Sequence, residues 1–188
     1  MQAIWDRRSI RKFEERPVPK ELVERILEAA TRAPSGKNAQ PWYFMVLQGK
    51  KKDMLADLMM ERVIALREQG VNTGSAGPTA RTMRQAPVAI LVYNPRWTPD
   101  QDRTGFNRFI SLVDTQSVGA AVQNITLAAT ALGLGTLWIG DIFCAEDAVG
   151  RWLGMTHELV CAVSLGYPAE APPARPRKSV AEVTRWLE

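Results

Sequence analysis

The sequence predicts a single domain over residues 1–188, of the α+β or α/β class, in which helices sandwich a central sheet. Four short apolar runs are continuous rather than alternating, which is typical of strands buried on both faces. Longer segments with apolar residues at helical spacing separate these runs. The 188 residues can bury a sizeable core, and no repeat or internal boundary divides them.

The expected elements follow from these patterns in chain order. The expected helices are 2–8, 20–32, 51–68, 112–133 and a short one near 146–152. The expected strands are 42–47, 88–93, 136–139 and 159–165. Pro19 suits the first turn of the second helix, and Pro34-Ser35-Gly36 ends it. We interpret the glycine-rich stretch 70–79 as a mobile linker or lid, and 94–108 as irregular chain.

The segment from Thr115 to Gly140 carries no charged residue, so it imitates a membrane span. It contains Gln116, Gln123 and Asn124 and lacks flanking cationic clusters, which favours a completely buried helix instead. A helix that is apolar on nearly all sides needs cover on all sides. In a chain of this length, a second subunit is a natural source of that cover.

Charge and composition exclude several classes of protein. Hydrophobic residues make up 46% and charged residues 23%, so disorder of the whole chain is not expected. The net charge of +4 is scattered apart from short clusters, which argues against a nucleic-acid binder. One such cluster, Lys50 to Lys52, is interpreted as a solvated surface.

The thiols and the single imidazole offer little chemistry. Cys144, Cys161 and His157 are too few for a four-ligand zinc site, so no metal is expected. A disulfide has no support because no signal peptide is expected, and we predict two buried thiols in a cytoplasmic protein. No GxSxG elbow accompanies His157, which argues against a serine hydrolase.

The basic segment at Arg7, Arg8, Arg11 and Lys12 admits three interpretations: nucleic-acid binding, one phosphate of a small cofactor, or a solvated turn. Three further motifs follow it in order. The four motifs are RRSIR at 7–11, APSGKNAQPW at 33–42, ALGLGTLWIG at 131–140, and GYPAE at 166–170 followed by RPRK at 175–178. This ordered set resembles the nitroreductase family of flavin-dependent oxidoreductases over residues 3 to about 183.

The resemblance implies a three-layer α+β sandwich with a mostly antiparallel sheet and an intertwined homodimer with FMN at the subunit interface. Arginine suits phosphate oxygens because its fork can bind them bidentately. By resemblance, the residues that hold the FMN phosphate are Arg7, Arg8, Ser9, Arg175 and Arg177. Arg11 matches a cation at the N1/C2=O edge of the flavin, where it would stabilise the reduced ring.

Two other motifs are expected at the flavin ring. Pro34, Ser35 and Gly36 match a loop brought from the partner subunit, and Asn38 either bonds the ring edge or closes the turn. The segment Trp138-Ile139-Gly140 matches one that passes over the flavin near N5, where glycine permits close approach of the backbone.

The implied activity is ping-pong transfer of hydride from NADH or NADPH through flavin N5 to a nitroaromatic, quinone or similar small molecule. The flavin carries the chemistry, so no catalytic acid or base is assigned. Acceptor choice is expected in 70–85 and 94–110, where Trp97, Phe106 and Phe109 are either pocket-lining or core residues. No membrane and no nucleic-acid partner is expected.

Three alternatives stay open at this point. One is specialised flavin chemistry in the same fold, such as dehalogenation or oxidative breakdown of the flavin itself. Another is a non-enzymatic flavin-binding redox sensor. The third is nucleic-acid binding through 7–12, which predicts an affinity that falls steeply with salt.

Overall fold

The computed structural model describes residues 1–99 and 101–187, and its centre is a four-stranded antiparallel sheet. The strands are β1 (Tyr43–Gln48), β2 (Val88–Asn94), β3 (Gly135–Ile139) and β4 (Glu158–Gly166), in the spatial order β1-β2-β4-β3. Each neighbouring pair is antiparallel. The predicted α+β class with an antiparallel sheet is therefore confirmed.

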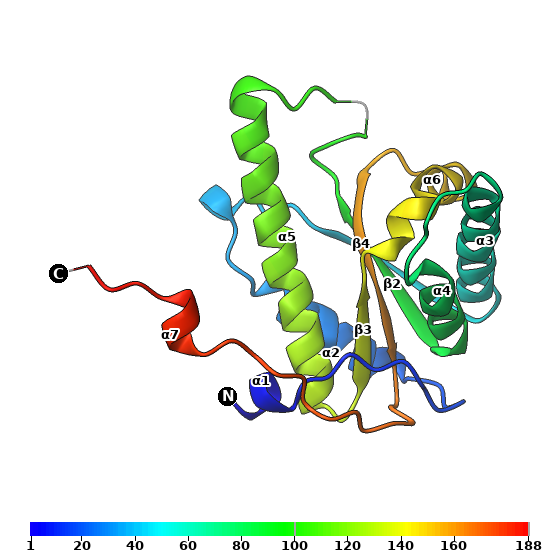
Figure 1. Cartoon of the computed structure of the whole chain (residues 1–188), viewed down its shortest axis with the longest axis horizontal. Coiled ribbons are helices and arrows are strands. Elements are labelled where there is room, and N and C mark those ends of the chain that lie inside the picture. The colour runs from blue at the N-terminus through cyan, green and yellow to red at the C-terminus, as the bar shows by residue number, and fades with distance from the viewer. Residues whose placement is uncertain (100, 188) are drawn as a thin grey trace.

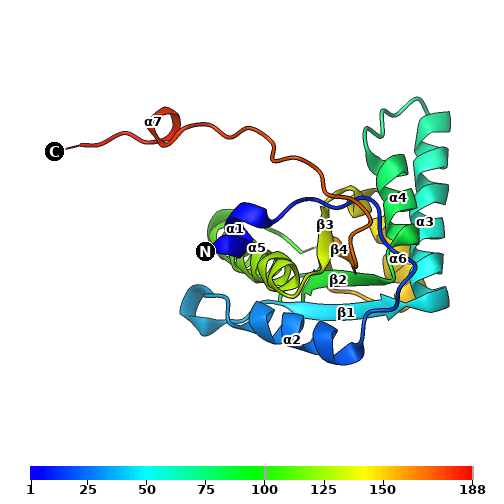
Figure 2. The same cartoon turned by 90° about the horizontal axis from the view of Figure 1, so that it is seen from below.

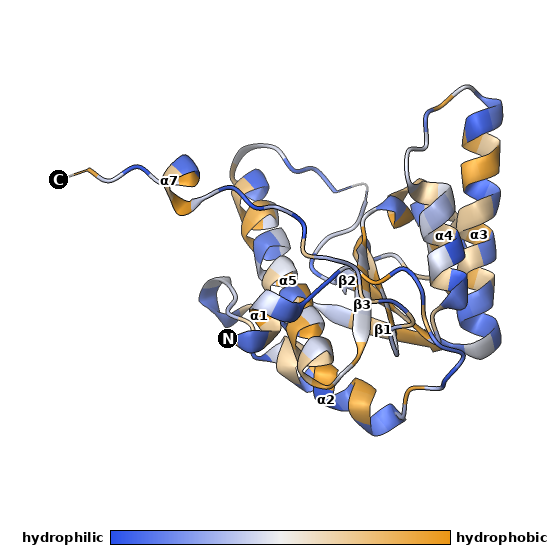
Figure 3. Cartoon of the chain, turned by 60° about the horizontal axis from the view of Figure 1, so that its bottom comes forward, coloured by the Kyte–Doolittle hydropathy of each residue, from blue (hydrophilic) through white to orange (hydrophobic). Residues whose placement is uncertain are grey.

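Helices cover both faces of this sheet and give three layers (Figures 1 and 2). One face carries α3 (Gly49–Glu68), α4 (Ala76–Gln85) and α6 (Glu146–Leu153); the other carries α2 (Lys20–Thr31) and α5 (Gly105–Ala131). Strand β2 serves both layers, because alternate side chains point to opposite faces and all seven of its residues are buried. In Figure 3, much of the sheet is coloured hydrophobic, whereas α3 alternates between polar and apolar residues.

Helix α5 confirms the prediction of a long apolar helix but begins seven residues before the predicted start at 112, at Gly105. Its inner face is completely buried at Val118, Val122 and Ile125. Among the residues that the structure describes, no helix is long and apolar enough to span a membrane.

Three expectations about local structure are wrong. The region 70–85 is not irregular throughout, because α4 occupies Ala76–Gln85. The first turn of α4 contains Gly77 and Pro78, a pair that is typical of loops. Proline nevertheless suits the first turn of a helix. Strand β1 is not buried on both faces, because it lies at the edge of the sheet. Lys52 is not solvated: it is buried against Asp53 and the Arg84 carbonyl.

The two terminal segments lie against the same end of the sheet. After helix α1 (Gln2–Asp6), Ser9 forms a parallel bridge with Thr136, and Phe13 forms an antiparallel bridge with Pro168. Beyond these bridges the C-terminal tail runs away from the body of the molecule (Figure 1). A short helix, α7 (Val180–Val183), lies in this tail, and its Ser179–Glu182 capping box holds it without any buried residue.

Candidate cofactor site

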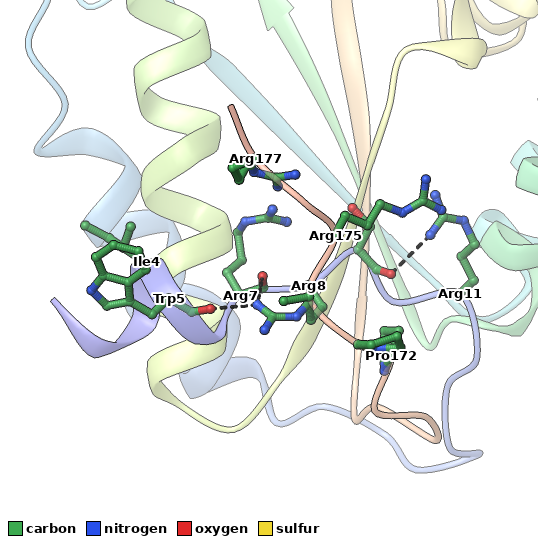
Figure 4. Close-up of a pocket in the computed structure, with 11 residues that line it drawn as sticks. Ile4, Trp5, Arg7, Arg8, Arg11, Pro172, Arg175 and Arg177 are labelled. Atoms are coloured by element: carbon green, nitrogen blue, oxygen red, sulfur yellow. Dashed lines mark hydrogen bonds between the residues drawn. The ribbon is translucent and has the colours of Figure 1, made fainter. Parts of the chain in front are cut away.

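The predicted phosphate residues lie around one hollow of about 520 Å³. Figure 4 shows arginine side chains from both terminal segments gathered there. The polar lining residues are Arg7, Arg8, Ser9, Arg11, Arg175 and Arg177. No carboxylate is among the described residues that line it, so the hollow is strongly electropositive and chemically suited to a phosphate dianion.

The position of the N-terminal half depends on strand β3. The backbone N–H of Ile10 donates to the Thr136 carbonyl at 2.9 Å, and the Ile10 side chain is buried. A Cβ at Gly135 would lie 2.7 Å from Ile10 Cγ1, which is closer than real carbon contacts allow. Glycine at this position therefore lets the segment with Ser9 lie directly on the sheet.

A carboxylate outside the hollow joins its two halves. Glu170 Oε1 accepts hydrogen bonds from the backbone N–H groups of Arg11 and Lys12, the latter at 3.2 Å. The backbone N–H of Ala169 also donates to the Lys12 carbonyl at 2.9 Å. Residues 11–12 of the N-terminal segment are thus joined to residues 169–170, just before the C-terminal arginines, by contacts that the sequence motifs did not indicate.

The arginines differ in how they are held. Arg8 Nη1 donates to the carbonyls of Trp5 at 2.6 Å and Arg7 at 2.9 Å, which closes the end of α1. Arg11 Nη1 donates to the Ser9 carbonyl at 3.2 Å. Arg177 Nη1 donates only weakly to the neighbouring Pro176 carbonyl, at 3.3 Å. The Arg8 guanidinium is therefore already hydrogen-bonded to two backbone carbonyls, whereas the Arg177 guanidinium is freer to bind an anion.

A smaller cavity of about 220 Å³ shares Arg11 with this hollow and contains the predicted ring segment. Its lining residues are Arg11, Ser75, Pro78, Thr79, Thr82, Leu137, Trp138, Ile139, Gly140 and Asp141. Ile139 is buried in the sheet, whereas Trp138 is 44% exposed. The residues predicted at the phosphate and those predicted at the ring therefore line two separate cavities that share Arg11.

The loop 34–38 lies apart from both cavities. The Ser35 hydroxyl accepts from the backbone N–H of Gln40 at 3.0 Å, so Ser35 closes this turn in the chain. Asn38 has a left-handed backbone (φ 55°), which is an uncommon conformation for a residue other than glycine. Gly36 instead lines a cavity of about 500 Å³ along α5, together with Phe106 and other residues. One chain therefore does not bring Pro34, Ser35, Gly36 and Asn38 to the arginines.

The aromatic candidates for acceptor binding separate into two groups. Phe106 and Phe109 are exposed and line the cavity along α5. Trp97 is buried, and its indole Nε1–H donates to Asp114 Oδ2 at 2.9 Å. Trp97 is thus a core residue and does not line the pocket.

Neither thiol is reactive in this environment. Both cysteines are free; Cys161 is buried as expected, whereas Cys144 is only half-buried, so the prediction of two buried thiols is wrong for Cys144. Burial raises the pKa of Cys161 to about 12. Burial, and then the negative charge of Asp141, raise the pKa of Cys144. Both thiols are therefore protonated at neutral pH and lack nucleophilic thiolate.

Ser75, Thr79, Asp141 and Glu170 are polar residues of this region that the motif analysis left unassigned. Asp141 Oδ2 accepts hydrogen bonds from Ser75 Oγ at 2.7 Å and from Thr79 Oγ1 at 2.9 Å. The only signal in the sequence is that Asp141 follows Gly140. The hydroxyls lie more than sixty positions away, in the region interpreted as a loop.

Comparison with known proteins identifies the family of the chain. The family model described as "Nitroreductase family" matches residues 4–167. A protein of Methanothermobacter thermautotrophicus, provisionally named an NADH dehydrogenase/NAD(P)H nitroreductase, is 33% identical and aligns with 93% of this chain and 80% of its own length. The 5,6-dimethylbenzimidazole synthase of Rhodospirillum rubrum is 28% identical over 89% of this chain and 81% of its own length.

A solved structure from Desulfovibrio desulfuricans, provisionally named a nitroreductase in complex with FMN, is similar throughout. It is 32% identical, with a TM-score of 0.77, and covers 100% of this chain and 95% of its own.

Proposed function

Because the chain belongs to the nitroreductase family, we propose that it is an FMN-dependent oxidoreductase. In this proposal it takes hydride from NADH or NADPH and reduces a nitroaromatic, a quinone or a similar small acceptor. The observation that carries the proposal is the electropositive hollow beside the cavity of the ring segment. The similar structure named as an FMN complex supports the identity of the cofactor.

The residues of the hollow fit the phosphate and ribityl parts of FMN. In the proposal, Arg7 and Arg177 both bind phosphate oxygens, one from each terminal segment. The Ser9 hydroxyl adds a donor, while Arg8 and Arg175 contribute positive charge. Charge-assisted bonds of this kind are about twice as strong as neutral ones.

The ring segment supplies the remaining contacts. Bound FMN would accept hydride at N5 and deliver electrons from the reduced ring. In the proposal, Arg11 stabilises negative charge on the reduced flavin, and its presence in the lining of both cavities supports this role. The Gly140 backbone is proposed near N5. A Cβ there would meet no protein atom within 4 Å, so glycine is not needed for the packing of this chain.

We also propose a homodimer in which each cofactor site contains residues of both subunits. Helix α5 leaves Phe109, Leu112 and Val113 exposed, and the tail leaves Trp186 and Leu187 more than three-quarters exposed. Several exposed apolar side chains of this kind favour contact with another protein surface. A second copy accounts for it, because the loop 34–38 is expected at the ring and lies away from it within one chain.

The proposed location is the cytoplasm, whose reducing conditions suit two free thiols. No nucleic-acid or membrane partner is part of the proposal.

The first experiment records the visible spectrum of the purified protein, then titrates it anaerobically with NADH and with NADPH. Bleaching of bound flavin by either nucleotide supports the oxidoreductase, and a flavin that neither reduces favours a redox sensor. Arg7→Ala and Arg177→Ala should each weaken FMN binding far more than folding. Arg25→Ala, an exposed arginine on α2, is the matched control. Unchanged FMN affinity in both test variants would refute the phosphate assignment.

The relative named 5,6-dimethylbenzimidazole synthase supports a second candidate, the oxidative breakdown of the flavin itself. This candidate predicts that reduced FMN and oxygen are consumed together, with irreversible loss of the flavin absorbance. Under the leading proposal, the oxidised spectrum returns fully when air is admitted.

A further inference from the structure

The peptide before Asp141 is held by few contacts of its own. Ile139 is fixed because it pairs with Ala162 in the sheet, and Ile142 is fixed because it is completely buried. Between them, Gly140 is exposed, and the turn bond from the Phe143 N–H to the Gly140 carbonyl spans 3.1 Å. The Asp141 side chain is the next group along the chain whose hydrogen bonds can restrain this peptide.

The Asp141 carboxylate provides the missing restraint. One oxygen, Oδ2, accepts from Ser75 Oγ at 2.7 Å and from Thr79 Oγ1 at 2.9 Å. Ser75 is the residue that precedes α4, and Thr79 lies in its first turns. A carboxylate also interacts favourably with the positive end of a helix dipole. The contact therefore joins the start of α4 to the end of β3, the two walls of the ring cavity.

The charge of Asp141 is not neutralised by an ion pair among the described residues, because both of its bonded partners are neutral hydroxyls. Arg11 lines the same cavity. The cavity thus presents one cation and one anion, and these charges act in opposite directions on a ring that becomes negative when it is reduced.

We propose that Asp141 is a positioning residue for the flavin ring: its carboxylate holds α4 through Ser75 and Thr79 and so fixes the Gly140 peptide at the edge of the ring cavity. The proposal rests on the FMN-dependent function proposed above. The negative charge of Asp141 also lowers the reduction potential of the bound flavin, because it disfavours the anionic reduced form.

Two substitutions separate hydrogen bonding from charge. Asp141→Asn keeps an oxygen that can accept from both hydroxyls but removes the charge, whereas Asp141→Ala removes both. The double variant Ser75→Ala/Thr79→Val removes the donors and leaves the carboxylate. Arg81→Ala is the matched control, because Arg81 is an exposed residue of α4 and is not among the residues that line the cavity.

The first measurement uses no cofactor. Hydrogen exchange of the apo protein should become faster around 72–80 in Asp141→Ala and in the double variant, and remain unchanged in Asp141→Asn and in the control. The second measurement is FMN affinity by flavin fluorescence. The dissociation constant should rise about tenfold in Asp141→Ala and in the double variant, and less than about twofold in Asp141→Asn.

The third measurement is the midpoint potential of the bound flavin, which should become more positive in Asp141→Asn. Unchanged exchange and affinity in Asp141→Ala would overturn the proposal. Losses of equal size in Asp141→Asn and Asp141→Ala would also overturn it, because charge rather than hydrogen bonding would then act. If wild-type protein binds no FMN, the proposed function fails, while the exchange measurement still decides whether Asp141 holds α4.

Discussion

Gly135→Ala tests whether the contact between β3 and the N-terminal segment positions the phosphate cluster. The added Cβ would lie 2.7 Å from Ile10 Cγ1, 3.0 Å from its Cβ and 3.1 Å from its Cγ2. Because carbon atoms in contact prefer about 3.5–4.0 Å, the two backbones must separate by roughly 1 Å. The same movement displaces Ser9 and the neighbouring Arg7 and Arg8.

Two effects of this movement can be given magnitudes. Overpacking of a filled site costs about 1–3 kcal/mol, so the free energy of unfolding of the apo protein should fall by that amount. A shift of the phosphate ligands should also raise the FMN dissociation constant by on the order of tenfold, which corresponds to about 1.4 kcal/mol of binding free energy. Urea unfolding measures the first effect, and fluorescence titration with FMN measures the second.

A compensating substitution supplies the control. Ile10→Ala removes Cγ1 and Cγ2, the first and third of the close contacts, so Gly135→Ala/Ile10→Ala should bind FMN more tightly than Gly135→Ala alone. Wild-type affinity in the single variant would refute the reasoning. A double variant with no recovery would show that the loss comes from elsewhere in β3.

Three further predictions concern packing and ionisation. Gly36→Ala places a Cβ 2.5 Å from Val113 Cγ1, but Val113 is half-exposed and can change rotamer, so the urea midpoint should fall by an amount equivalent to about 1 kcal/mol; a fall of about 3 kcal/mol would show that Val113 cannot move aside. Asp114→Ala leaves the buried Trp97 indole without its acceptor and should lower the free energy of unfolding by about 1–3 kcal/mol, as followed by tryptophan fluorescence; a stability equal to wild type would show that this bond contributes nothing. Burial raises the pKa of Cys161 from 9.0 to about 12, so the unfolded thiol loses its proton first and stability falls as pH rises from about 9 toward 12. Urea midpoints across this range should fall less steeply in Cys161→Ala, and equal slopes would argue against the shift.

The sequence predicts the elements whose own residues determine their environment. Strand β2 is apolar and is buried between the layers as expected, whereas helix α5 is buried only on the face toward the sheet and leaves Phe109, Leu112 and Val113 exposed, so the expectation of a completely buried helix is wrong for the single chain. Strand β1 has a similar composition, but its place at the edge of the sheet depends on which strands pair with it, which composition does not encode. Helix α4 was missed because Gly77-Pro78 in its first turn resembles a loop.

The candidate site likewise has one part that its sequence motifs predict and another part that depends on contacts between distant segments. The motifs predict that the arginines of the two terminal segments act together, and the structure brings these cationic residues to one hollow, whose phosphate-binding role stays a proposal. The Asp141 contacts with Ser75 and Thr79 could not be predicted, because they span 66 and 62 positions and involve common residue types. Gly135 is likewise explained only by the packing of Ile10 against it.

The phosphate hollow is built from two segments that are more than 160 positions apart in the chain, one around Arg7 and the other around Arg177. An anion bound between these two segments would link the N-terminal and C-terminal regions reversibly. At a cofactor concentration of about 100 times the dissociation constant, binding stabilises the folded chain by about 2.7 kcal/mol. If the hollow holds the FMN phosphate as proposed, loss of the cofactor removes this link, and limited proteolysis should then cut the tail faster in the apo protein than in the FMN-loaded protein.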